Sequence, residues 1–486
     1  MSVGWNNTIF DDHGFRQSQT AISVYYTKWG SEFLSYKTPV LGPPWSIPFE
    51  FPLFQAIVAA IWHLFPLQLD QAGRLTSVAF FYLTFPPLFA LLRELKLGTL
   101  TALATVALFA VSPQYIFWSR TFMIESTAIC LAVTYLMFVV LALKYDDSRR
   151  TQILVFGLLS AVAGALAGVV KVTTYAPFLL AAMLLIGCRS RQSWDGSRLR
   201  GALVIFLPLC AVLIPVLSVA VWTQHADSLK DQSTYHHLLT SHMLRAWNFG
   251  TLRQRVELAN YVHFAGIGMG HVLDNLTGNR AILFMSCGVA LAASGYTLRV
   301  IMTCLALYGS ASAMFFNLHF VHTYYAYSNG IFLVTAVGVA VGSLLNVGGR
   351  KSWIGMCFFS LAIGICIMQY FHGYYRVQHS NAPGRPAAAA IVDRETKPSD
   401  ILLIDGLDWS SELPYQAHRR AIMMLEAHRD EAFQEAVREE GVNPISSLLI
   451  CGRGPIPTKD LLTALLQHGI NFTRRFDRDG CEIYLR

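Results

Sequence analysis

The sequence predicts an α-helical polytopic membrane protein that ends in a small α/β domain outside the membrane. Hydrophobic residues make up 54% of the 486 residues and charged residues only 14%, whereas a soluble protein carries about 25% charged residues. Long apolar runs fill residues 73–372, and the composition turns polar after residue 373. Much of the net charge of +7 lies in short loops between apolar runs, so it does not indicate nucleic-acid binding.

Ten apolar runs are long enough, or nearly so, to cross a bilayer core of about 30 Å as helices. Residues 50–65 are also apolar but short, and they begin with Glu50 and Pro52, which indicates a helix lying at the interface. The boundaries between the fourth and fifth and between the seventh and eighth runs are weakly marked. The ten runs cover 73–92, 98–118, 121–143, 152–170, 172–188, 201–222, 281–297, 299–318, 327–346 and 352–371.

Lysine and arginine residues predict the orientation of these runs. Short basic connections follow every second run, so they all fall on one side, which the positive-inside rule makes cytoplasmic. The outer side then receives a first loop of residues 1–72, the loop 223–280 and the tail 373–486. The sequence therefore predicts three parts, namely the first outer loop, a transmembrane domain of residues 73–372 and an outer α/β domain of residues 373–486.

Patterns in the tail predict the elements of this outer domain. Residues 382–386, Ala-Pro-Gly-Arg-Pro, indicate a linker. Alternating and helical periodicities predict a strand at 401–404, two helices near 412–440, a strand at 447–451, a helix at 458–468 and a strand pair near 470–485.

Cys451 and Cys481 are the only two of the nine cysteines in this domain. Cys451 ends one predicted strand and Cys481 begins another, and an outer compartment is oxidising, so a disulfide between them is one interpretation. Two buried thiols are the other. The sequence leaves both open because it does not specify the strand order.

The densest cluster of polar groups lies at the start of the first outer loop. Asp11, Asp12, His13 and Arg16 fall within six residues. Carboxylates, an imidazole and a guanidinium can supply a general base and an anion clamp. If this segment is helical, Asp12 and Arg16 share a face at i,i+4. The alternative is a solvated helix start with an exposed ion pair.

Three further charged residues are candidates for substrate contact. Glu50 stands between two phenylalanines and two prolines, which suits a fixed loop, although a helix start also favours a carboxylate. Arg120 and Glu125 bracket the outer start of the third run, where they could contact substrate or only satisfy each other.

Two later segments add candidates on the same face. Lys171 lies at the outer end of the fourth run, where a lysine can contact substrate or snorkel to the interface. His322 and Tyr325 belong to a segment rich in histidine and aromatic residues between two runs. These side chains suit a phosphate, a sugar hydroxyl or a metal ion, although tyrosines also occur at membrane interfaces for other reasons.

Taken in order, these segments resemble bacterial GT-C glycosyltransferases. They are most similar to the protein-O-mannosyltransferase-like branch that includes the lipid A aminoarabinose transferase. The resemblance covers most of the chain, and it rests on the order and common outer face of the segments rather than on any one motif. The segments are 13–21, 50–53, 112–113, 119–125, Lys171, 322–325, and 408–415 followed by Arg419.

The resemblance implies an activity. It implies transfer, with inversion, of a sugar from a polyprenyl-phosphate donor to an outer-leaflet acceptor, such as a lipopolysaccharide or another cell-envelope glycan. The setting it implies is a bacterial inner membrane, with the active site and the α/β domain on the periplasmic side.

The resemblance also implies roles for residues. Asp12 or Asp11 is implied as the base and Arg16 as a phosphate ligand. Glu50 matches an acidic residue that lies near a metal in some members, so a divalent metal ion stays open, and no other cofactor is implied. The remaining candidates are Lys171, His322 and Tyr325 for the donor phosphate, and Arg120 and Glu125 for another part of the substrate or metal site.

The sequence departs from the family in two places. Members close to the aminoarabinose transferase carry the acidic base three residues before the arginine, where this chain has His13. His13, oriented by Asp12, is therefore an alternative base. The family usually has a membrane span before the first loop, so we expect either a truncated start or a lost span.

The main rival interpretation is a transporter or flippase for a lipid-linked glycan; a catalytically inactive scaffold is a third. Transport predicts charged or unwound sites near the bilayer midplane. The apolar runs here are almost free of charge, with Glu125 and Lys171 at their ends. This pattern favours chemistry at the membrane surface.

Overall fold

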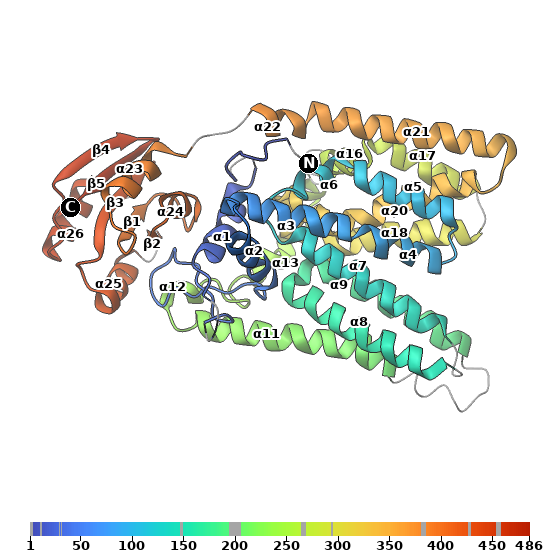
Figure 1. The fold of residues 1–486 in the computed structure, drawn as a ribbon, viewed down its shortest axis with the longest axis horizontal. Helices are drawn as coiled ribbons and strands as arrows, with labels where there is room; N and C mark the ends of the chain where they lie inside the picture. The colour runs from blue at the N-terminus through green and yellow to red at the C-terminus, as the bar shows by residue number, and fades with distance from the viewer. Residues whose placement is uncertain are drawn as a thin grey trace. The chain divides into compact units, whose positions relative to one another are not determined.

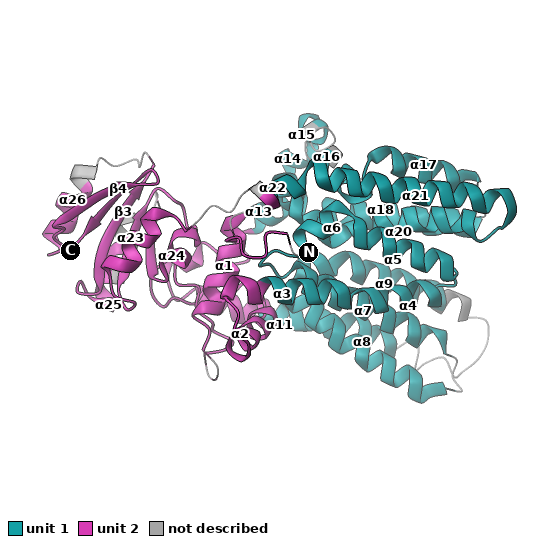
Figure 2. Cartoon of the chain, turned by 45° about the horizontal axis from the view of Figure 1, so that its top comes forward, with its two compact units in different colours: residues 1, 74–222, 245–377 teal, residues 2–73, 223–244, 378–486 magenta. Residues whose placement is uncertain are grey.

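The chain folds into two compact units, which are described separately. The computed structural model describes residues 3–9, 12–28, 30, 32–145, 149–193, 206–263, 269–292, 295–380, 385–425, 429–452 and 458–486. Unit 1 comprises residues 1, 74–222 and 245–377, and unit 2 comprises residues 2–73, 223–244 and 378–486 (Figure 2). The predicted outer loop 223–280 thus contributes residues to both units.

Eight helical stretches in the described part of the chain are long and apolar enough to cross a membrane, which makes this a multi-pass membrane protein. The other two predicted runs form α5 (Thr99–Val111) and α17 (Arg280–Ala292), of 13 residues each. At 1.5 Å per residue such a helix is about 20 Å long, short of the bilayer core. The eight stretches are Leu69–Glu94, Glu125–Lys144, Arg150–Val170, Val172–Arg189, Phe206–Lys230, Gly295–Met314, Thr323–Leu345 and Gly349–His372.

Most of the long helices labelled in Figure 1 belong to unit 1, which is teal in Figure 2. Three helices have residues in both units, namely α3 (Leu69–Leu83), α11 (Ile214–Lys230) and α22 (Tyr374–Ser380). Besides α5 and α17, the longer helices of unit 1 are α4 (Phe85–Glu94), α7 (Glu125–Lys144), α8 (Arg150–Val170), α9 (Val172–Ser193), α18 (Gly295–Met314), α20 (Ala326–Leu345) and α21 (Gly349–His372). Its shorter ones are α6 (Pro113–Trp118), α13 (Arg245–Phe249), α14 (Leu252–Val256), α15 (Leu258–His263), α16 (Met269–Thr277) and α19 (Phe316–Val321), with a π-helical turn η3 (Leu209–Leu213) and a 3-10 turn η5 (Thr323–Tyr325).

Helix α20 is the most enclosed helix of unit 1, because every residue from Ala326 to Gly342 is buried. Small residues allow close packing against α5. A Cβ atom at Gly338 would lie 2.0 Å from the Thr105 hydroxyl, and one at Gly342 would lie 2.0 Å from the Thr101 hydroxyl. Small residues at helix contacts are typical of membrane proteins, where van der Waals packing drives helix association.

The first loop and the C-terminal domain are both parts of unit 2. The first loop forms α1 (Gly14–Tyr25) and α2 (Leu53–Leu64), the second confirming a helix within the apolar stretch 50–65. Residues 39–41 continue the C-terminal sheet, since the backbone N–H groups of Ala421 and Met423 donate to the carbonyls of Pro39 and Val40 over 2.9 Å each. Residues 223–244 of the predicted outer loop also belong to this unit, and they contain helix α12 (Thr234–His237).

The C-terminal domain is a sheet with helices, as predicted, and the sheet has five strands where the sequence predicted four. The strand order is β2-β1-β3-β5-β4; β1 is parallel to β2 and β3, and β5 is antiparallel to β3 and β4. Its strands are β1 (Ile401–Asp405), β2 (Arg420–Met424), β3 (Ile445–Cys451), β4 (Arg474–Arg478) and β5 (Cys481–Leu485). Its helices are α23 (Ala387–Glu395), α24 (Glu412–Ala417), α25 (Arg429–Glu440) and α26 (Thr458–Gln467).

Strand β2 corrects one prediction in this domain. Residues 412–440 were expected to hold only two helices, yet β2 lies between α24 and α25. Of its residues Ala421 to Met424 only Ile422 strongly favours a strand, and the segment forms one because it pairs with β1 inside the domain core. Residues 382–384 of the predicted linker lie outside the described residues.

The structure decides between the two interpretations of Cys451 and Cys481. These residues are register partners on β3 and β5, their α-carbons are 4.1 Å apart, and they form a disulfide. The disulfide interpretation is therefore confirmed. The seven other cysteines are free thiols.

Candidate active site

The predicted base region immediately precedes α1. The helix begins at Gly14, and His13 adopts a left-handed conformation with φ 46°. Asp12 therefore lies outside the helix, and the i,i+4 relation expected between Asp12 and Arg16 is wrong. The Asp12 carboxylate lies 3.9 Å from Nε2 of His13, and the two side chains are 41% and 25% exposed. Asp11 lies outside the described residues.

Arg16 and Glu50 form an ion pair between α1 and the segment before α2. Arg16 donates from Nη2 to Oε2 of Glu50 over 3.1 Å and from Nη1 to Oε1 of Gln19 over 2.6 Å. Gln55 donates to the other Glu50 oxygen over 3.0 Å. Both carboxylate oxygens are thus bound, and the guanidinium plane is held from two directions.

A buried tyrosine holds the backbone at Glu50. The Tyr36 hydroxyl donates to the Glu50 carbonyl and accepts from the Phe49 N–H, both over 3.1 Å. Burial, together with the nearby Glu50 carboxylate, raises the pKa of Tyr36 well above its ordinary value, so the hydroxyl stays neutral. The glutamate that aligns Arg16 is therefore fixed at both its side chain and its backbone.

Sequence reasoning missed several members of this cluster. Gln19 lies one helical turn after Arg16, and Gln55 is a polar residue in the mostly apolar helix α2; both patterns were available in the sequence. Lys230 comes from the predicted outer loop and lies 5.1 Å from the ring centre of Phe49. Its ammonium is buried, 2.9 Å from an Asp227 carboxylate oxygen. Nothing in its local sequence indicates this contact.

A second cation–carboxylate pair lies in unit 1. Lys171 occupies the single-residue break between α8 and α9, and its ammonium contacts Oε1 of Glu125, the first residue of α7. A carboxylate at this end of a helix is favoured by the helix dipole. Among the described residues, the other oxygen of Glu125 is buried without a hydrogen-bond partner.

Aromatic and histidine side chains surround Lys171. Its ammonium lies 5.3 Å from the ring centre of Tyr324 and 4.8 Å from that of Tyr325. His322 lies against both tyrosine rings, with centroids 5.4 and 6.2 Å away. Burial, and then the Lys171 charge, lower the pKa of His319 below its ordinary value. The structure thus brings together Lys171, His322 and Tyr325, three of the predicted donor-side residues.

Arg120, the other charged candidate at the start of the third run, is also buried. It lies in the turn after α6, and the carboxylate of Glu125 is held by Lys171. The Ser77 hydroxyl of α3 binds the carbonyls of Thr121 and Met123 over 2.7 and 3.1 Å, which fixes the turn. The cation that contacts Glu125 is therefore Lys171, which lies 46 residues further along the chain.

The described residues do not fit the metal ion that the sequence left open. Within the described ranges, no three or more His, Cys, Asp and Glu side chains gather in a way that could hold a metal ion. Glu50 is bound by Arg16 and Gln55. We therefore derive no step through a metal.

Comparison with known proteins confirms the fold. No protein-family model matches the sequence, and a search of curated proteins found no match. The chain is similar to the crystal structure of ArnT from Cupriavidus metallidurans bound to undecaprenyl phosphate, with a TM-score of 0.61, 13% identity, and 96% of this chain and 93% of that chain covered.

Two longer proteins share the fold. The arabinofuranosyltransferase AftD from Mycobacteria matches with a TM-score of 0.51, 15% identity, and coverage of 99% of this chain and 38% of that one. The Archaeoglobus fulgidus oligosaccharyltransferase, in complex with Zn and sulfate, matches with 0.50, 12% identity, and 90% and 63% coverage. At these identities the similarity concerns the fold, and the GT-C fold implied by the sequence is confirmed.

Proposed function

We propose that this protein is a membrane glycosyltransferase that moves a sugar from a polyprenyl-phosphate donor to an outer-leaflet acceptor. The observation that carries the proposal is the Arg16–Glu50 pair, held by Gln19, Gln55 and Tyr36, on a GT-C fold. ArnT, which shares this fold over nearly its whole length, was solved with undecaprenyl phosphate.

The proposed reaction is an inverting displacement at the anomeric carbon. The acceptor hydroxyl forms the new bond while the bond to the phosphate oxygen breaks, and the phosphate leaves with the electron pair. Asp12, or His13 with Asp12 orienting it, takes the proton of the acceptor hydroxyl. Because the leaving phosphate needs no protonation, one base is sufficient, whereas glycosidases use two carboxyl groups.

Arg16 stabilises the leaving group in this proposal. Negative charge develops on the phosphate as the bond breaks, and a guanidinium already fixed in place binds it without reorganisation. Arginine also matches the two-oxygen geometry of a phosphate. Glu50 and Gln19 are therefore positioning residues for Arg16. The roles of Lys171, His322 and Tyr325 toward the donor phosphate stay predictions.

Membrane topology supports an outer-face reaction. The carbonyls of Pro39 and Val40 in the first loop accept backbone hydrogen bonds from Ala421 and Met423 of the C-terminal domain, which supports placing both on one side of the bilayer. The basic loops predict that this side is periplasmic. Reporter fusions after Arg150 and Arg486 should therefore report opposite sides, and identical locations would contradict the topology.

Donor consumption by the purified protein tests the function. A panel of radiolabelled polyprenyl-phosphate sugars is incubated with the protein and cell-envelope acceptors, and release of free polyprenyl phosphate is measured. We expect one donor to be consumed, with label appearing in the acceptor. A transporter would move donors across vesicles without consuming them, and that result would overturn the proposal.

A further inference from the structure

The C-terminal domain contacts both ends of α1, the helix that carries Arg16. At the start of α1, the Phe15 ring packs edge-on against Trp409 with centroids 4.9 Å apart. At the end of α1, Tyr25 stacks on His418 at 5.1 Å. Trp409 and His418 flank α24, which packs along α1. All of these residues belong to unit 2.

Trp409 also reaches the segment that carries Glu50. Its ring lies 5.9 Å from that of Phe49, the neighbour of Glu50. One indole therefore touches the residue directly before Arg16 and the residue directly before Glu50. Aromatic pairs of this geometry stabilise a contact beyond what the area they bury provides.

The contact at the other end of α1 is rigid because the turn at His418 is locked. Arg419 is buried and donates to the carbonyls of Ala417 and His418 over 3.1 and 3.2 Å. It also binds a carboxylate oxygen of Asp393 over 3.0 Å and the Thr396 carbonyl over 2.7 Å. His418 is thereby held in a left-handed conformation with φ 53°.

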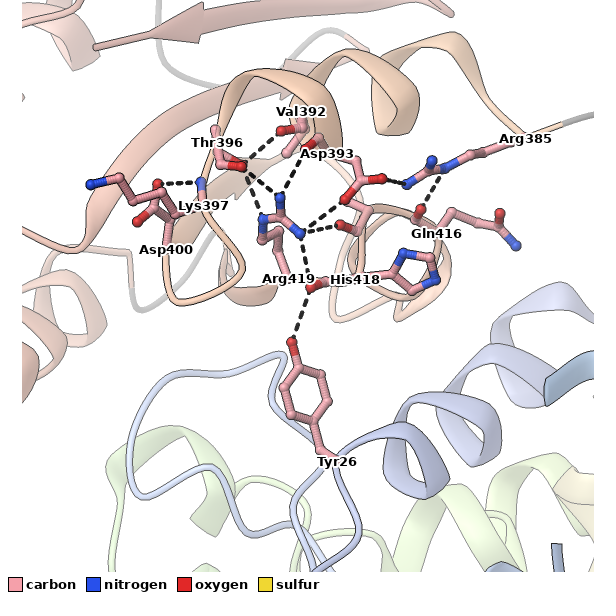
Figure 3. Close-up of polar contacts among 11 residues, drawn as sticks. Tyr26, Arg385, Val392, Asp393, Thr396, Lys397, Asp400, Gln416, His418 and Arg419 are labelled. Atoms are coloured by element: carbon pink, nitrogen blue, oxygen red, sulfur yellow. Dashed lines mark hydrogen bonds and ion pairs between the residues drawn. The ribbon is translucent and has the colours of Figure 1, made fainter. Parts of the chain in front are cut away.

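Figure 3 shows how this turn meets α1. The Tyr26 hydroxyl and Arg419 both donate to the His418 carbonyl, the former over 3.3 Å. Burial raises the pKa of Tyr26, so its hydroxyl remains a donor at every physiological pH. The end of α1 is thus bonded to a turn whose conformation Arg419 sets.

We infer that Trp409 is a positioning residue for the Arg16–Glu50 pair and that the segment from Trp409 to His418, which contains α24, braces α1. This inference rests on the proposed function and assigns a role to the segment 408–415. Displacing a catalytic group by about 1 Å can cost on the order of a hundredfold in rate. An indole that packs on both Phe15 and Phe49 restricts the relative movement of their neighbours.

The test combines kinetics of the full-length protein with a double-mutant cycle. Trp409→Ala should lower kcat/KM about tenfold, and Trp409→Phe, which keeps a ring, should recover most of the loss. In an Arg16→Ala background, Trp409→Ala should cost less than about twofold, because its effect passes through Arg16. Losses that multiply in the double variant would overturn the inference.

A second measurement does not depend on activity. Amide hydrogen exchange across α1 should accelerate in Trp409→Ala and remain unchanged in Phe472→Ala, which removes an aromatic contact with Tyr484 elsewhere in the domain. Unchanged exchange in α1 would refute the brace. If exchange changes while the wild-type protein consumes no donor, the brace stands and the proposed function fails.

Discussion

Four of the candidate functional residues form two cation–carboxylate pairs, Arg16–Glu50 and Lys171–Glu125, and the surroundings of the two pairs differ. Arg16 and Glu50 are 19% and 8% exposed, and Gln19, Gln55 and the Tyr36 hydroxyl surround them. Lys171 and Glu125 are 10% and 2% exposed, and tyrosine rings and a neutral histidine surround them.

The difference indicates different roles: Glu50 aligns the Arg16 guanidinium, whereas Lys171 compensates the buried charge of Glu125. In the first pair, the side-chain amides of Gln19 and Gln55 also bind the charged groups. Removing the Glu50 carboxylate therefore leaves the Arg16 guanidinium bound to Gln19 and partly exposed to solvent. In the second, Glu125 has one oxygen without a hydrogen-bond partner among the described residues, so Lys171 supplies most of its compensation. We expect the first pair to govern transfer and the second to govern stability as well.

The largest expected effect lies outside both pairs. Asp12→Asn should reduce transfer at least about a hundredfold, because it removes the proposed base or its orienting group. Turnover of labelled donor is the measurement. Glu32→Gln is the matched control, since Glu32 is a carboxylate of the same loop that pairs with Lys37 at 3.6 Å. Near-normal turnover in Asp12→Asn with a loss in His13→Ala would make His13 the base.

Breaking the buried pair should cost the most stability. Lys171→Ala leaves the Glu125 carboxylate buried and uncompensated, so we expect about 3 kcal/mol of destabilisation in thermal or denaturant unfolding in detergent. Replacing both residues, as in Lys171→Met with Glu125→Leu, should recover most of this loss. Lys37→Ala at the exposed pair with Glu32 should cost under about 1 kcal/mol. Equal losses at the two sites would remove the distinction.

The first pair should affect rate more than stability. Arg16→Ala and Glu50→Gln should each lower kcat/KM at least about tenfold, equivalent to about 1.4 kcal/mol of transition-state stabilisation. Their unfolding midpoints should shift less than that of Lys171→Ala. Normal kinetics in both variants would reduce the Arg16–Glu50 pair to a structural contact.

The smallest expected effect is a pH dependence of stability in unit 2, the unit that contains the first pair. Burial lowers the pKa of His236 to about 4, and its Nε2 lies 3.2 Å from the Gly42 carbonyl. The unfolded chain binds a proton below about pH 6.5 while the folded protein does not, so stability falls as the pH falls. We expect His236 to account for a loss of about 1 kcal/mol between pH 7 and 5.5.

His236→Gln provides the comparison for this prediction. The difference in unfolding midpoint between the wild-type protein and this variant should change over the same pH interval. A constant difference would show that His236 titrates normally in the folded protein.

Local sequence patterns predicted the elements whose stability is local. Apolar length identified α7, α8, α20 and α21, because a helix satisfies its own backbone inside a bilayer. It overestimated the length of α5. The apolar run 98–118 is not one helix, because α5 ends at Val111 and a separate helix, α6, begins at Pro113. It also missed β2, whose strand conformation depends on pairing with β1.

The sequence by itself determined which groups were available: Arg16, Glu50, Glu125, Lys171, the histidines around residue 320 and the two outer cysteines. Only the tertiary structure decided which of them meet. Arg16 and Glu50 are separated by 34 residues, and Lys171 and Glu125 by 46. Such pairings depend on how helices and loops pack, since the packing sets both the distance between two groups and the water that remains around them.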